Sequence, residues 1–215
     1  MYCVVHFGFA TASGKAGTHF VKPVKLLPQG YMPVTSLDLS RNRRAFWSVQ
    51  VVGTLLFFAF GWAFLRFGIL LRREAFTQSI TLAGILGLVV AMFVVIVIHE
   101  VVHGVVFWVC TRELPRFGFK GVYAYTAAPS WFLPRRQHLT AALAPFVLIT
   151  AIGMALTPFI PAGALLIWLF GLTVNAAGAV GDFFVAALSL SQPADVLVND
   201  YGDGITLYSV PRKSS

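Results

Sequence analysis

The sequence predicts an all-α membrane protein with four transmembrane helices, a short β-hairpin or extended segment between the second and third helices, and a small polar tail. Of the 215 residues, 58% are hydrophobic and only 11% are charged, whereas soluble domains carry roughly 25% charged residues. The apolar residues gather in four runs, each long enough to cross about 30 Å of hydrocarbon. Both observations place the chain in a bilayer.

The four runs divide the chain into three parts. Residues 1–46 are polar and basic, contain several prolines, and are expected to form a cytoplasmic N-terminal arm with a short extended segment. Residues 47–190 are expected to form the transmembrane domain, and residues 191–215 a polar cytoplasmic tail with a strand-like segment, ITLYSV. The expected spans cover residues 47–70, 79–110, 139–156 and 164–190.

The segment between the second and third spans, about residues 111–138, resembles neither a span nor an ordinary helix. In RFGFKGVYAY, Gly118 and Gly121 stand between the aromatic residues Phe117, Phe119, Tyr123 and Tyr125, a pattern typical of a short hairpin or ribbon. An ordinary amphipathic loop on the membrane surface fits the same residues equally well.

The basic residues indicate the orientation. The chain has a net charge of +8, but its Lys and Arg lie between the apolar runs rather than in a surface stripe, which argues against nucleic-acid binding. The arm, the 111–138 segment and the tail hold 6, 5 and 2 of the 16 basic residues. Because Lys and Arg are retained on the cytoplasmic side, both termini are expected in the cytoplasm, and a prokaryotic cell membrane is the expected location.

Three polar residues interrupt the second apolar run in the order HEVVH. His99 and His103 are four residues apart, so in a helix they lie on one face and can bind a single metal ion. Two imidazoles suit one Zn²⁺ ion at about 2.0–2.1 Å. Glu100 lies about 100° around the helix, where it can act as general base toward a water. The alternative is a pair of helical histidines that satisfy each other or a backbone carbonyl.

Asp182 is the predicted third ligand. Together with Glu100 it is one of two acidic residues within the four expected spans, where a charge costs roughly 2.5–3.5 kcal/mol. His103 precedes Arg112 by 9 residues and Asp182 precedes Gln192 by 10. At about 1.5 Å per residue, both groups lie roughly 14–15 Å from the cytoplasmic ends of their spans. A carboxylate satisfied by Asn175 or a neighbouring helix is the simpler alternative.

Other candidate ligands fit less well. Cys110 is about 10 Å along the helix from His103, and Glu113 lies beyond the helix end. We expect His138 to be a solvated residue at the start of the third span, and His6 and His19 to be ordinary surface histidines of the arm.

Asn175, Gly178 and Asp182 share one helix face by their spacing. Gly178 and Gly181 carry no side chain, so this helix is expected to press closely against the HEVVH helix. Asn175 could bond a substrate carbonyl or orient a ligand, and a role in polar packing is an equal alternative.

With HEVVH in one span and NAAGAVGD in another, the chain resembles the site-2-protease-like intramembrane zinc metallopeptidases. It is most similar to the small bacterial and archaeal zincin peptidase family of uncharacterised function. The resemblance extends over most of the chain, through LPQGY, HEVVHG, YAYTAAP, LAPF, the Asn-to-Asp helix and DGITLYS.

The resemblance implies specific roles for four residues. His99, His103 and Asp182 correspond to the ligands of one zinc ion, and Glu100 to the general base. Unlike the better-known site-2 proteases, the chain has no proline between Asn175 and Asp182, and Phe183 follows the aspartate. Substrate class and regulation therefore do not carry over.

The expected function is a zinc-dependent intramembrane endopeptidase that cuts a membrane-protein or peptide substrate close to the cytoplasmic face. Residues near Gly118, Gly121 and Tyr123 would hold an unwound substrate segment as an added strand. The alternative is a metal-binding or transport-related membrane protein that uses the His/His/Asp site without hydrolysis. Glu100 distinguishes the two, because a transport site needs no general base.

Overall fold

The computed structural model describes residues 22–38, 42–72, 81–121, 123–202 and 204–211. His6, His19, the first half of the arm, the polar turn after the first span and Asp203 of the tail lie outside these residues. The described helices are α1 (Arg43–Arg72), α2 (Leu82–Thr111), α3 (Arg135–Leu156), α4 (Ala162–Gly178) and α5 (Val180–Leu190), with a 3-10 turn η2 (Thr157–Phe159). The strands are β1 (Met32–Asp38), β2 (Arg116–Phe119), β3 (Ala124–Ala127), β4 (Phe132–Pro134), β5 (Leu197–Asp200) and β6 (Gly204–Ser209).

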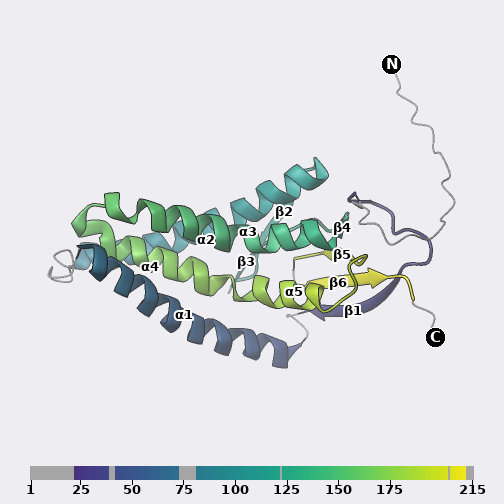
Figure 1. Cartoon of the computed structure of the whole chain (residues 1–215), viewed down its shortest axis with the longest axis horizontal. Helices are drawn as coiled ribbons and strands as arrows, with labels where there is room; N and C mark the ends of the chain where they lie inside the picture. Colours follow the sequence, from purple (N-terminus) through teal and green to yellow (C-terminus); the bar gives the residue numbers. More distant parts are fainter. Residues whose placement is uncertain (1–21, 39–41, 73–80, 122, 203, 212–215) are drawn as a thin grey trace, which may run out of the picture.

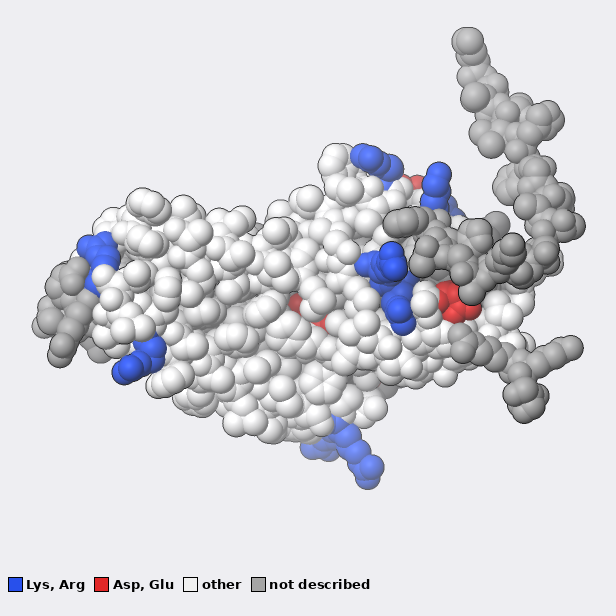
Figure 2. Space-filling view, viewed as in Figure 1, with Lys and Arg blue, Asp and Glu red and all other residues white. Residues whose placement is uncertain are grey.

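The fold is mostly helical. The helices run alongside one another in an elongated bundle, with β1, β4, β5 and β6 at one end of it (Figure 1). Four helical segments are long and apolar enough to cross a membrane, over residues 43–72, 82–111, 135–159 and 162–190. Figure 2 shows that the visible side of the bundle is largely uncharged, while Lys and Arg gather toward its two ends. That distribution is the one a bilayer requires.

Helix α2 carries the HEVVH motif on its single buried stripe. Its N-terminus is capped by the Thr81 hydroxyl, which accepts a hydrogen bond from the Gly84 amide at 3.1 Å. Most of its large apolar side chains are exposed, as expected for a helix surrounded by lipid. The buried residues recur every four positions, at Val95, His99, His103, Phe107 and Thr111, so this stripe faces the rest of the protein.

The fourth span is interrupted. It was expected as one helix over 164–190, but α4 ends at Gly178 and α5 begins at Val180. The residue between them, Ala179, has φ −66° and ψ 2°. The break falls between Asn175 and Asp182 and leaves Asp182 in the first turn of α5. There the helix dipole favours a negative charge.

A four-stranded antiparallel sheet forms at one end of the bundle, in the order β1-β6-β5-β4. The extended segment of the arm and the strand-like tail are both present, as β1 and β6, and they pair with each other from Met32↔Ser209 to Asp38↔Gly204. A buried cluster of Val196, which precedes β5, and Val198, Ile205 and Leu207 of the sheet packs against Val185 and Leu188 of α5. The sheet is thereby fixed to the helix that carries Asp182.

The expected hairpin between the second and third spans is also present. Strands β2 and β3 form a separate two-stranded antiparallel sheet in which Gly118 pairs with Tyr125. Gly121, with φ +75°, makes the turn, a conformation that glycine adopts without steric cost. A side chain at Gly104, just after HEVVH, would overlap the Phe117 ring. This glycine therefore lets β2 lie close against α2.

Candidate metal centre

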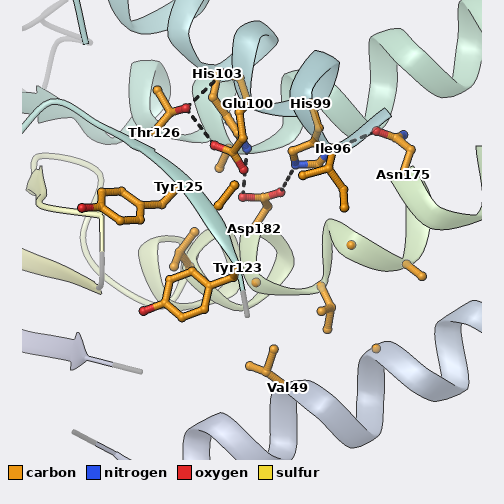
Figure 3. A pocket seen from close by; sticks show the side chains of 18 of the residues that line it. Val49, Ile96, His99, Glu100, His103, Tyr123, Tyr125, Thr126, Asn175 and Asp182 are labelled. Carbon is orange, nitrogen blue, oxygen red and sulfur yellow. Dashed lines mark hydrogen bonds and ion pairs between the residues drawn. The ribbon is translucent and has the colours of Figure 1, made fainter. Parts of the chain in front are cut away.

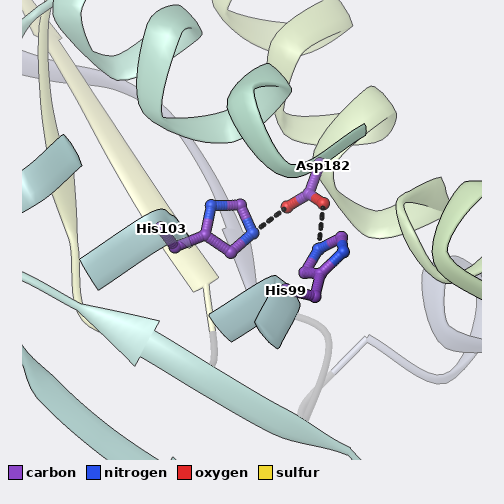
Figure 4. Close-up of side chains that lie close together, drawn as sticks. All are labelled: His99, His103 and Asp182. Atoms are coloured by element: carbon purple, nitrogen blue, oxygen red, sulfur yellow. Dashed lines mark hydrogen bonds and ion pairs between the residues drawn. The ribbon is translucent and has the colours of Figure 1, made fainter. Parts of the chain in front are cut away.

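The structure brings His99, His103 and Asp182 together. The imidazoles project from α2 and the carboxylate from α5, and they face one another (Figure 4). His99 Nε2 lies 3.1 Å from Asp182 Oδ2, and His103 Nε2 lies 3.3 Å from Asp182 Oδ1. One potential ligand atom from each residue lies within 4.8 Å of the others. Both histidines are buried, with relative exposures of 9% and 8%.

The other ring nitrogen of each histidine, Nδ1, lies within hydrogen-bond distance of a carbonyl oxygen, which can accept a hydrogen bond but not donate one. His103 Nδ1 lies 2.8 Å from the Ala141 carbonyl oxygen, so it donates its proton there. His99 Nδ1 lies 3.0 Å from Asn175 Oδ1. The Asn175 amide nitrogen donates to Thr150 Oγ1 at 3.4 Å, which orients its oxygen toward His99. Both rings, when neutral, therefore carry their proton on Nδ1.

This tautomer turns both Nε2 lone pairs toward the Asp182 carboxylate. Two lone pairs and a carboxylate that converge without a donor repel one another, and either a proton on an imidazole or a cation bound between the groups relieves this repulsion. Ligands placed about 2.0–2.1 Å from a tetrahedral zinc ion lie about 3.3 Å apart. The separations of 3.1 Å to Asp182 Oδ2 and 3.3 Å to Asp182 Oδ1 are close to that value. Two imidazoles and a carboxylate are a donor set that suits one zinc ion, so His99, His103 and Asp182 could hold it.

Glu100 lies beside this centre and is held by the hairpin. The Thr126 hydroxyl of β3 lies 2.7 Å from Glu100 Oε2 and 3.0 Å from the Glu100 carbonyl oxygen. Figure 3 shows the carboxylate of Glu100 between Thr126 and the metal ligands, with Tyr123 and Tyr125 on the same strand region. Thr126 has no counterpart among the residues expected from the sequence.

A cavity of about 810 Å³ joins these residues. It is lined by His99, Glu100, His103 and Asp182, by Tyr123, Tyr125 and Thr126 of the hairpin region, and by residues of α1 and the four-stranded sheet. Its size is within the range of about 300–1,000 Å³ typical of ligand pockets. Residues of β3 line it, whereas no described residue of β2 does.

The other predicted site residues take different places. Asn175 lies behind His99 and supports it, in the ligand-orienting position. Tyr123 lines the cavity, whereas Gly118 and Gly121 do not. The Tyr125 ring packs over Gly118, where any side chain would overlap it.

Two expectations were wrong. His138 is not solvated: it is 1% exposed, because it faces inward from the first turn of α3. Nothing lies within 4 Å of a Cβ added at Gly178 or Gly181, so the close helix approach expected there is absent. Both glycines line the cavity instead, where they leave room for a ligand.

The fold and the site define a mostly helical protein with four potential membrane spans and a possible three-ligand metal site beside a carboxylate. Residues 92–197 match a family model described as "Putative zincin peptidase". The matched segment contains HEVVH, the hairpin, Asn175 and Asp182, so it includes the whole candidate site. Neither the curated proteins nor the solved structures contain a match to the chain.

Proposed function

We propose that the protein is a zinc-dependent intramembrane endopeptidase that hydrolyses a peptide bond in or near a transmembrane segment, close to the cytoplasmic face. The observation that carries this proposal is the set of acceptors described above: two Nε2 lone pairs and a carboxylate converge, with a second carboxylate beside them. The match of residues 92–197 to the zincin peptidase model supports the same chemistry.

Each residue around the candidate metal site has a separate role in the proposed hydrolysis. Asn175 and the Ala141 carbonyl fix the tautomers and the orientation of the two histidines. His99, His103 and Asp182 would hold a zinc ion, which would supply Lewis acidity toward a water and the substrate carbonyl. Glu100 accepts a proton from the attacking water and delivers it to the leaving amine nitrogen. Thr126 keeps the Glu100 carboxylate on the cavity side of the helix.

Strand β3 is the proposed support for the substrate. A peptide bond can reach the site only if the substrate segment is unwound, and an exposed strand edge can hold such a segment through main-chain hydrogen bonds. Because β3 lines the cavity and carries Thr126, we place the unwound segment along β3, next to Tyr123. Lysines and arginines at the sheet end would orient that end toward the cytoplasm.

Metal analysis of the purified protein tests the centre. The wild type should retain about one zinc per chain, while His103→Ala and Asp182→Ala should retain little, since a catalytic zinc site has three protein ligands. Asp195→Ala, at an exposed position of the segment between α5 and β5, is the control and should keep its zinc. Stoichiometric zinc in both ligand variants would contradict the assignment.

The Glu100→Gln variant distinguishes a peptidase from a protein that only binds or transports metal ions. It preserves the shape of the side chain and removes its basicity, so it should retain zinc and lose cleavage of a reconstituted transmembrane peptide by about 10²-fold or more. A protein that only binds or moves metal ions should be unaffected. Full cleavage by Glu100→Gln would rule out the proposed base.

Replacing Gly121 with proline tests the strand. Proline requires φ near −65°, so it cannot adopt the φ of +75° at this turn and should displace β3. We expect reduced cleavage with zinc retained. Gly30→Pro, at another glycine of positive φ (+86°), is the matched control, and unchanged proteolysis by Gly121→Pro would count against the role of the hairpin.

A further inference from the structure

The cavity extends well beyond the metal centre. In addition to the candidate ligands, it is lined by His138 of α3, Asp200 of β5, and Gly202 and Ile205 beside it. These residues belong to the sheet end of the molecule (Figure 1). An ordered water occupies only about 30 Å³, so a metal ion and its water fill a small part of the 810 Å³. The remainder can hold several residues of a bound peptide.

The sheet end of the cavity carries one carboxylate, that of Asp200. Among the described residues that line the cavity there is no Lys or Arg, and the carboxylates are Glu100, Asp182 and Asp200. Glu100 and Asp182 belong to the metal centre. Asp200 has no part in it, and its carboxylate borders a largely apolar cavity with His138 Nε2 at ion-pair distance.

The Asp200 carboxylate keeps free capacity to accept hydrogen bonds. Its Oδ1 accepts from the Gly202 amide at 2.9 Å, and its Oδ2 lies 3.7 Å from His138 Nε2, which is longer than a hydrogen bond. His138 Nδ1 lies 3.4 Å from the buried Ser189 hydroxyl. An ionised carboxylate offers about four acceptor sites, so most of them remain for a ligand. The side chain is 17% exposed.

Helix α3 links Asp200 to the metal centre. His138, 3.7 Å from Asp200, lies three residues, about 4.5 Å along the helix, before Ala141, whose carbonyl oxygen bonds His103. An extended chain advances about 3.3–3.6 Å per residue. A substrate side chain a few residues from the cut bond, on the sheet side, can therefore reach Asp200.

We propose that Asp200, oriented by His138 and the Gly202 amide, forms a subsite for a cationic side chain, Lys or Arg, of the bound peptide. This inference rests on the proposed peptidase function only in taking that peptide to be the substrate. A charge-assisted bond to a partly buried carboxylate is among the strong polar interactions. Transmembrane segments carry Lys and Arg on their cytoplasmic side, so the subsite selects that flank and positions the adjacent apolar residues over the metal centre.

Peptide binding to the zinc-loaded Glu100→Gln protein in detergent tests the subsite without cleavage. The probes are fluorescent peptides with one apolar segment and a short flank that contains lysine, glutamine or glutamate. We expect the lysine peptide to bind on the order of tenfold more tightly than the glutamate peptide. Asp200→Asn, which keeps the acceptor for Gly202 and removes the charge, should bring the ratio close to one. Asp195→Asn is the matched control and should preserve the ratio.

The outcomes separate this proposal from the peptidase function. A lysine preference that survives Asp200→Asn, or an equal loss of affinity for all three peptides, overturns the subsite. Cleavage of the peptides by the Glu100-containing protein without charge preference also overturns it and leaves the peptidase standing. An Asp200-dependent preference in a protein that cleaves none of the peptides supports the subsite and contradicts the peptidase.

Discussion

At the scale of single residues, the two histidines differ in what holds them. His103 bonds a backbone carbonyl on α3, whereas His99 bonds the side chain of Asn175 on α4. A backbone acceptor cannot be removed by substitution, but a side-chain acceptor can. The orientation of His99 therefore depends on the identity of residue 175, whereas that of His103 does not depend on the side chain at residue 141.

Thr126 offers the most direct test of how Glu100, the proposed general base, is positioned. Removing its hydroxyl leaves the Glu100 carboxylate without its 2.7 Å donor. We expect Thr126→Val to lower the single-turnover cleavage rate by about tenfold, out of the 10²–10⁴-fold that general acid–base catalysis contributes, with zinc content unchanged. Thr126→Ser should restore most of the rate.

Two comparisons complete this test. Thr140→Val removes a hydroxyl that bonds only the Arg136 carbonyl on the exposed side of α3, and it should cleave at the wild-type rate. In a Glu100→Gln background, Thr126→Val should cause no further loss, because residues acting through each other are not additive. A full additional loss of cleavage rate in that background would mean that Thr126 does not act through the Glu100 carboxylate.

The residues of the candidate metal site stand out in the sequence because they interrupt apolar runs. His99, His103 and Asp182 stand out as polar groups in apolar spans, where their cost requires an explanation. Thr126 and Ala141 carry no such signal: a threonine in a short strand and a backbone carbonyl in a helix are ordinary. His138 was misjudged because its position beside Arg135 and Arg136 resembles a solvated boundary, and only the tertiary fold buries it.

At the scale of elements, local pattern predicted the helices and the hairpin but not the sheet. The apolar runs and the Gly-aromatic ribbon are continuous in sequence. By contrast, β1 and β6 pair residues that are far apart in the sequence, such as Met32 and Ser209. The local pattern of apolar and polar residues does not indicate which distant segment a strand will pair with. The break at Ala179 was missed as well, because the run from α4 into α5 remains apolar throughout.

Gly204 controls the pairing of β1 with β6. A Cβ there would overlap the Leu37 carbonyl oxygen and lie 2.8 Å from the Asp38 Cα, and backbone atoms cannot move aside without breaking the ladder. We expect Gly204→Ala to lower the free energy of unfolding by about 1–3 kcal/mol. Gly171→Ala, where nothing lies within 4 Å of the added Cβ in α4, should be neutral or stabilise by up to about 1 kcal/mol. Equal unfolding midpoints in detergent would contradict this role for Gly204.

At the scale of the whole molecule, a contact at the sheet end ties the N-terminal segment to the end of α2. The Lys25 ammonium pairs with Glu113 and lies 5.1 Å from the centre of the Trp131 ring. The Trp131 indole donates to the other Glu113 oxygen at 3.0 Å. The hydrogen bond from Lys25, followed by that from Trp131, lowers the pKa of Glu113.

This shift has a defined effect on stability. Because the folded chain holds the pKa of Glu113 below its unfolded value, the contact stabilises the fold fully above the unfolded pKa, and the contribution disappears as pH falls through the lowered folded pKa. The difference in melting temperature between wild type and Glu113→Gln should therefore shrink from about pH 6 to about pH 3. A difference that stays constant over this interval would show that Glu113 acts without its charge.

The pairing of β1 with β6 also constrains how the chain can be threaded through a bilayer. Adjacent strands of one sheet must lie in the same compartment, so the segments before α1 and after α5 can meet only if the chain crosses the membrane an even number of times. This parity is independent of the distribution of lysine and arginine. If the four helices span a membrane, failure of one of them to insert would separate β6 from β1 while β5 stays beside it, so the β1–β6 pairing would form only in a correctly inserted chain.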